Sequence, residues 1–155
     1  MLISTHSFRA AATVLALVFM AACSSRKDDV TPTPNMSWTV DGTNEKANII
    51  THSTGGNTLF LNGYAGDTAT SYHYVSIWLP KTVAVGTYSL ATNAAGAYST
   101  IANRTGTTYI GRTGSITVTS LTATNIEGTF AFAETPISPQ SVIKTITNGT
   151  FNVDL

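Results

Sequence analysis

The sequence predicts an all-β domain that folds as an antiparallel, meander-rich β-sandwich or flattened barrel. Apolar and polar residues alternate with a period of two over most of the chain after Met36, as they do along strands with one buried face. Short turn signals rich in Gly and Asn separate these stretches. No stretch after Met36 shows helical periodicity. With 28 threonines and only 10% charged residues, the strand faces are expected to carry hydroxyl groups rather than salt bridges.

Residues 114–134 carry the clearest strand pattern. Ile116 and Val118 alternate with Ser and Thr, and after a polar turn Phe130 and Phe132 alternate with Thr and Ala. Because successive side chains of a strand point to opposite faces, this stretch predicts a hairpin with one apolar face and one Thr-rich face.

The register of this hairpin predicts a β-bulge. If Leu121 pairs with Ile126 across the turn, simple counting directs Ile116 away from the two phenylalanines. One extra residue, at Thr119 or Ser120, returns Ile116 to the face of the two phenylalanines.

Seven further strands are expected before this hairpin. They span residues 36–40, 46–52, 58–64, 72–79, 86–90, 98–102 and 107–112. Turns are expected at 41–44, 54–57, 93–96 and 103–106, with a loop at 65–71. Pro80 is expected to end the fourth strand because proline cannot donate a hydrogen bond to the ladder.

The end of the chain is expected to form another hairpin, after a loop bracketed by Pro136 and Pro139. Asn148-Gly149 favours a two-residue turn between strands at 142–147 and 150–155. That register pairs Ile146 with Phe151 and Val142 with Leu155, and it places Lys144 beside Val153. The lysine is then expected near a rim, where its amine reaches water.

The first 22 residues resemble a secretory signal. Their apolar run, 11–22, is shorter than the ~20 residues that span a bilayer, but it suits the core of a signal peptide. The run ends in Ala21-Ala22-Cys23, which resembles the lipobox of bacterial lipoproteins. The resemblance implies cleavage before Cys23, acylation of its thiol and amino group, and a membrane partner through this anchor. A plain signal peptide with an incidental cysteine and an uncleaved anchor are the alternatives.

Residues 23–35 are expected to form a flexible tether that carries the acylated cysteine. The segment 24–29 resembles the surface-export signal of Bacteroidota lipoproteins, because Lys27 is followed by two acidic residues. It implies an outer-membrane protein exposed at the cell surface. The alternative is a solvated charge run in a periplasm-facing protein. One all-β domain, 36–155, follows the tether.

Several motifs of this domain resemble an uncharacterised family of small Bacteroidota outer-membrane lipoproteins whose domain has no assigned function. The motifs are Val40-Asp41-Gly42 after a Trp-containing strand, Gly86-Thr87-Tyr88, and the segments 114–119, 126–132 and 146–151. The resemblance covers roughly residues 36–155 and supplies no catalytic residues.

Composition excludes some partners and nominates no cofactor. The formal net charge is zero and no Lys/Arg cluster is present, so a nucleic-acid partner is not expected. The single cysteine excludes an internal disulfide and a multi-cysteine metal site. His52, Asp67 and His73 lie in neighbouring segments, but their spacing matches no metal motif, and surface residues without a role are expected.

An aromatic face is the better candidate site. If strands 58–64 and 72–79 are neighbours, five rings share the face opposite the aliphatic one, namely Phe60, Tyr64, Tyr72, Tyr74 and Trp78. Such rings suit sugar or protein ligands when exposed, and they are structural when a second sheet or a loop covers them. Separately, Asp67-Thr68-Ala69 resembles a Bacteroidota O-glycosylation motif, which makes Thr68 a candidate modification site.

These observations favour a lipid-anchored binding or accessory module of unknown activity, with a glycan or an envelope protein as its partner. A structural envelope component that acts through protein contacts is the alternative. An enzyme is the least favoured reading, because the sequence contains no Gly-x-Ser-x-Gly, His-Glu-x-x-His or phosphate-loop motif.

Overall fold

A computed structural model describes residues 33–135 and 143–155 of the chain. In these residues the protein is all-β, which confirms the predicted fold class. The ten strands are β1 (Asn35–Val40), β2 (Thr43–Lys46), β3 (Ile49–Gly55), β4 (Thr58–Asp67), β5 (Ser71–Pro80), β6 (Gly86–Ser89), β7 (Ala95–Ala102), β8 (Thr105–Leu121), β9 (Asn125–Thr135) and β10 (Thr145–Asp154). Cys23, Pro136, Pro139 and Val142 lie outside the described residues.

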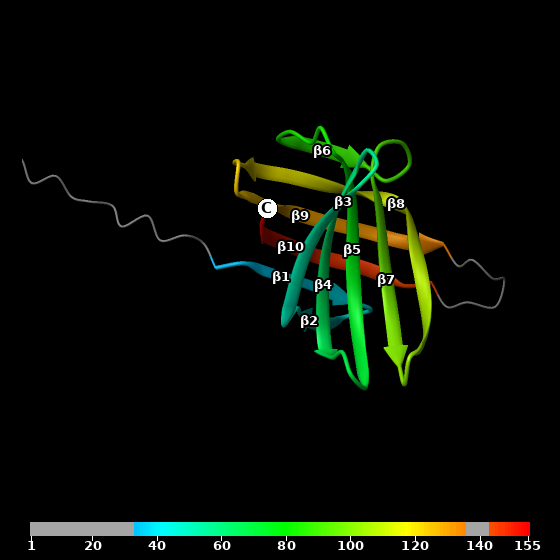
Figure 1. Ribbon diagram of the computed structural model, residues 1–155. Coiled ribbons are helices and arrows are strands. Elements are labelled where there is room, and N and C mark those ends of the chain that lie inside the picture. Colours follow the sequence, from blue (N-terminus) through cyan, green and yellow to red (C-terminus); the bar gives the residue numbers. More distant parts are fainter. Residues whose placement is uncertain (1–32, 136–142) are drawn as a thin grey trace, which may run out of the picture. The chain divides into compact units, whose positions relative to one another are not determined.

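The strands form one antiparallel sheet in the order β2-β1-β10-β9-β8-β7-β5-β4-β3, and β6 pairs with β8 off this path. The sheet curls into a half-barrel. Figure 1 shows β3, β4, β5 and β7 crossing in front of β1, β10 and β9, while β8 curves from one half to the other. The first part of β8 pairs with β7 and its last part with β6, so one long strand replaces the two separate strands expected at 107–112 and 114–121.

The core lies on the concave face of the curled sheet. It is built by the alternating apolar residues of each strand, including Trp38, Leu61, Ile77, Ile116 and Ile146, all at most 2% exposed. Large rings reach this close packing by lying on glycines of neighbouring strands. A Cβ atom at Gly96 would lie 2.7 Å from Phe132 Cε1, and one at Gly111 would lie 2.8 Å from Phe132 Cδ2, so only glycine fits beneath this ring.

The predicted bulge in the hairpin of β8 and β9 is confirmed. Leu121 pairs with Ile126, the register shifts between Val118 and Ser120, and Ile116 pairs with Phe130. Thr119 is therefore the extra residue. Burial of the apolar face sets this register, because a slip of one residue would turn every buried side chain to the other face.

The prediction of a turn at Asn148-Gly149 is wrong, because β10 continues through both residues. Asn148 has φ 50° and forms a bulge, at which the pairing with both β1 and β9 shifts register. A continuous strand forms a ladder on both of its sides, whereas a hairpin would give up much of that pairing. Consequently Ile146 does not pair with Phe151, and Lys144 does not lie beside Val153.

Two other expectations need correction. The strand predicted at 46–52 is split at Ala47-Asn48, where the chain passes from one end of the sheet to the other. The amide of Ala47 donates to Met36 O of β1 (2.8 Å), and that of Asn48 donates to Tyr64 O of β4 (2.8 Å). The loop expected at 65–71 shrinks to a turn of three residues, because β4 and β5 pair out to Asp67 and Ser71. Pro80 ends β5 as predicted.

Candidate functional site

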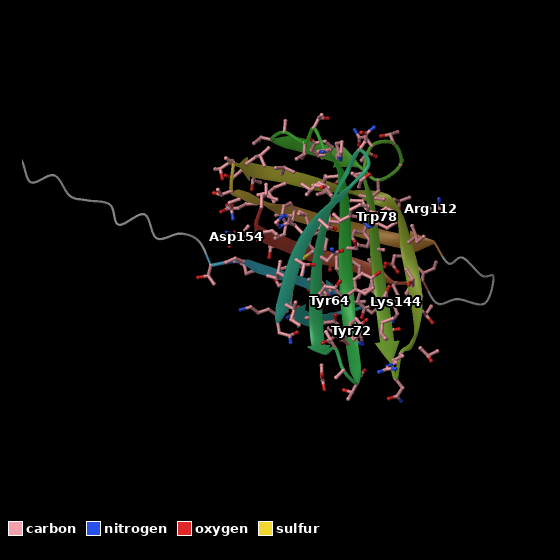
Figure 2. All side chains as sticks on the ribbon, viewed as in Figure 1. Tyr64, Tyr72, Trp78, Arg112, Lys144 and Asp154 are labelled. Carbon is pink, nitrogen blue, oxygen red and sulfur yellow. The ribbon has the colours of Figure 1, made fainter. Side chains whose placement is uncertain are left out.

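The five predicted aromatic residues lie together on the convex face of β4 and β5, opposite the core. We call them the outer aromatic face: Phe60, Tyr64, Tyr72, Tyr74 and Trp78. All five rings are half-buried rather than buried. Figure 2 shows Trp78 near one end of β5 and Tyr64 and Tyr72 near the other. No strand of the described chain lies over them, so the alternative of a covering second sheet does not apply (Figure 1).

The rings of this face form two groups. Phe60 and Trp78 pair across the strands in an edge-on arrangement with centroids 5.8 Å apart. Tyr64 stacks on Tyr74 at 5.5 Å and also contacts Tyr72 at 5.9 Å. Burial is the main cause that raises the pKa of Tyr64, and the neighbouring tyrosines act in the same direction. The two groups are four residues apart along β4, which is roughly 13 Å at ~3.3 Å per residue.

A short chain of hydrogen bonds leads from the Trp78 indole to Asn62, which lies between the two aromatic groups along β4. Trp78 Nε1 donates to Ser76 Oγ (2.8 Å), and Ser76 Oγ donates to Asn62 Oδ1 (2.7 Å). The indole is thereby fixed with its only donor satisfied, so it offers a partner its ring surface rather than a hydrogen bond.

The strands that carry and flank this face are almost free of charge. Among the residues of β3, β4, β5 and β7, the only Lys, Arg, Asp or Glu is Asp67, at the end of β4. The remaining outward positions are mixed. Thr51, Ser53 and Asn62 carry hydroxyl or amide groups, whereas Ile49, Ala97 and Ile101 are apolar. A neutral partner that offers hydroxyl groups and apolar patches matches this composition better than an ionic one does.

The concave side holds a polar cluster that the sequence did not reveal. We call Glu45, Trp38, His73 and Tyr98 the Glu45 cluster. Glu45 of β2 accepts hydrogen bonds from Trp38 Nε1 (2.7 Å) and from the Tyr98 hydroxyl (3.2 Å), and it lies 2.6 Å from His73 Nδ1. One carboxylate thereby connects β1, β5 and β7 to the short strand β2. Burial is the main cause that raises the pKa of Tyr98, and the nearby Glu45 adds to it.

Glu134 is another acid on the same side of the sheet, and it is more deeply buried than Glu45. It is 2% exposed, and neither carboxylate oxygen forms a hydrogen bond within the described part of the chain. Burial raises the pKa of Glu134 to about 8, and Asp41 acts in the same direction. The nearby Tyr98 amide and the Lys144 amine act in the opposite direction and lower the pKa in part. The side chain is therefore mostly a neutral acid at pH 7.

Lys144 points to the turn between β1 and β2 instead of to Val153. Its Nζ donates to Asp41 Oδ2 (2.6 Å), and Asp41 Oδ1 accepts from the Thr145 amide (3.1 Å). The hydrogen bond from Lys144 is the main cause that lowers the pKa of Asp41, and the same bond raises the pKa of Lys144. This pair fixes the start of β10, and the lysine keeps its expected position near a rim.

The trio of His52, Asp67 and His73 is not assembled. His52 pairs with Leu61, whereas His73 pairs with Ala65 further along β4 and contacts Glu45. Asp67 closes the β4–β5 turn by accepting from the Ala69 amide (2.9 Å) and the Thr70 hydroxyl (3.0 Å). Across residues 33–135 and 143–155, no group of three His, Cys, Asp or Glu side chains is placed to hold a metal ion.

Thr68, the candidate modification site, lies in this same turn. It is exposed, and the bonds formed by Asp67 leave its hydroxyl at the tip of the connection between β4 and β5. A glycosyltransferase can reach such a position without unfolding a strand. O-glycosylation of Thr68 stays a prediction.

Two sequence signals could have found the buried acids. Trp38 alternates with Met36 and Val40 on a buried strand, and a buried indole needs an acceptor, which Glu45 on the next strand supplies. Glu134 follows Phe130 and Phe132 at a spacing of two, so it continues their buried face. The partners of Glu45 on β5 and β7 are 28 and 53 positions away, and no local pattern reports them.

In the part of the chain that the structure describes, no helix could span a membrane. Comparisons with protein-family models, with curated proteins and with solved structures found no match.

Proposed function

We propose that this protein is a lipid-anchored binding module of the outer membrane, exposed at the cell surface and acting through its outer aromatic face on a glycan. The observation that carries the proposal is the half-exposed set of five rings on an almost uncharged face. Pyranose rings have apolar faces that pack on aromatic side chains and hydroxyl groups that bond to amides and hydroxyls. The resemblance of residues 36–155 to outer-membrane lipoproteins supports the proposed membrane, and the acidic segment after Cys23 supports exposure at the cell surface.

The first test is retention on neutral polysaccharides. The full chain, purified in detergent, is expected to bind at least one of insoluble cellulose, chitin, xylan or mannan. Tyr64→Ala and Tyr74→Ala are expected to reduce retention about fivefold or more, because each removes one partner of the stacked pair. Thr147→Ala, which changes an exposed residue of β10, serves as the control. Absence of retention, or equal retention by all variants, would favour the structural envelope component instead.

The second test concerns the anchor at Cys23. Wild-type cells are expected to incorporate labelled palmitate into the protein, to hold it in the membrane pellet and to release its domain when intact cells are treated with protease. Cys23→Ala is expected to lose the label and to leave the pellet, because several acyl chains are needed for stable anchoring. A labelled, pelleted Cys23→Ala protein would contradict the anchor. Complete protection of the wild type from protease would place the domain in the periplasm.

A further inference from the structure

A hollow beside Trp78 lies at the end of the outer aromatic face. It has a volume of about 350 Å³, within the size range of small-molecule sites, and lies between the β3–β4 turn and the loop before β7. Its polar and aromatic lining consists of Asn57, Thr58, Trp78, Thr92 and Asn93, and the rest of the lining, which includes Pro80, is apolar. We call it the Trp78 hollow.

The lining of the Trp78 hollow contains no charged side chain. The Asn57, Thr58, Thr92 and Asn93 side chains form no hydrogen bonds within the described chain, so their amides and hydroxyls are available to a ligand. Phosphate, carboxylate and ammonium ligands would find no counter-charge here. A neutral polyol would find donors and acceptors on both sides of an aromatic ring.

Both walls of the hollow are held in place by backbone hydrogen bonds. The Lys81 amide donates to Asn57 O (2.8 Å), which ties the β3–β4 turn to the end of β5. On the other side, Ser89 O accepts from the amides of Thr92, Asn93 and Ala94 at 3.1–3.3 Å. A site with fixed walls loses little conformational entropy when a ligand binds.

From this geometry we infer that the Trp78 hollow is a subsite for one neutral hexopyranose unit. This inference rests on the proposed function and names its ligand class and position. One face of the sugar packs on the Trp78 indole, whose donor is already bonded to Ser76, and the sugar hydroxyls bond to the Asn57 and Asn93 amides. The tyrosine group then lies roughly 13 Å further along β4, within reach of the next units of the same glycan.

Tryptophan fluorescence tests the subsite directly. The chain has two tryptophans, and Trp38 is 2% exposed, so quenching by acrylamide reports mainly on Trp78. The methyl glycosides of glucose, galactose, mannose and N-acetylglucosamine are the probes, and glucuronate is the charged comparison. At least one neutral glycoside is expected to protect Trp78 from quenching in the full chain, whereas glucuronate is not.

Variants assign the binding to the hollow, with saturation-transfer NMR as the readout. Trp78→Ala is expected to weaken glycoside binding about tenfold, as loss of a stacked ring does. Trp78→Phe is expected to restore part of it. Asn93→Ala changes an exposed residue without side-chain bonds, so it should fold normally and weaken binding about fivefold. Thr147→Ala should bind like the wild type.

The outcomes separate the two proposals. If the protein is retained on a polysaccharide through Tyr64 and Tyr74 but no glycoside protects Trp78, the subsite is wrong and the proposed function stands. Glycoside binding that survives both Trp78→Ala and Asn93→Ala, or equal binding of glucuronate, also overturns the subsite. If neither polysaccharides nor glycosides bind the wild type, the proposed function itself fails.

Discussion

Raising the pH from about 5 to about 9 is expected to lower the free energy of unfolding by about 4 kcal/mol, mainly through Glu134. In the unfolded chain the Glu134 carboxyl has its ordinary pKa of 4.5, whereas in the folded chain its pKa is about 8. This stabilisation is fully present below the unfolded pKa and is lost as the pH rises through the folded one. Urea unfolding of the full chain at several pH values measures the change.

The variant Glu134→Gln isolates the cause of this pH dependence. Its amide is neutral at every pH, so its stability should match that of the wild type near pH 5 and exceed it near pH 9. The Asp41 carboxyl, with its lowered pKa, and the Lys144 amine, with its raised pKa, titrate outside this window. A wild-type stability that is flat over this range, or an equal slope in Glu134→Gln, would show that Glu134 is not a buried neutral acid.

Removal of the Glu45 carboxylate is expected to destabilise the domain by about 3 kcal/mol, because Glu45→Ala leaves the buried Trp38 and Tyr98 donors without an acceptor. Glu45→Gln keeps one acceptor oxygen and should lose about half as much. His73→Ala should cost less than Glu45→Ala, since the His73 side chain is 42% exposed. Chemical denaturation at constant pH compares the three variants.

Lys46→Ala is the matched control for Glu45. It changes the neighbouring residue of β2, whose side chain is exposed on the opposite face of the strand. It should stay within about 0.5 kcal/mol of the wild type. If Glu45→Ala is no less stable than Lys46→Ala, the Glu45 cluster does not hold β2 to the middle of the sheet.

Alternation along the strands was enough to predict the all-β fold, the shared face of the aromatic residues and a bulge at Thr119 or Ser120. These features depend on residues close together in sequence, and the burial of one face fixes them. The prediction of a turn at Asn148-Gly149 was wrong for a physical reason. The left-handed backbone that Asn adopts in a tight turn also suits a bulge within a strand, and pairing with β1 and β9 decided between the two.

In the candidate sites too, local patterns predict some features, whereas others depend on contacts between distant segments. The sequence placed Phe60, Tyr64 and Trp78 on one face, but their exposure depends on how the whole sheet curls. The Trp78 hollow combines the end of β5 with a turn and a loop from other parts of the chain, so no single stretch could indicate it. The Glu45 cluster likewise depends on contacts between distant strands.

The pairing of β1 with β10 also determines the order in which the domain can be completed. Ser37 and Thr150, whose hydroxyls are 2.9 Å apart, are separated by 113 positions in sequence. The hairpins from β3 to β9 pair residues that lie near one another in sequence, whereas β1 is connected to β9 only through the distant strand β10. Such distant pairing slows folding, because the chain loses loop entropy before the contact stabilises it. Until then, the first strand of the domain stays without its main neighbour.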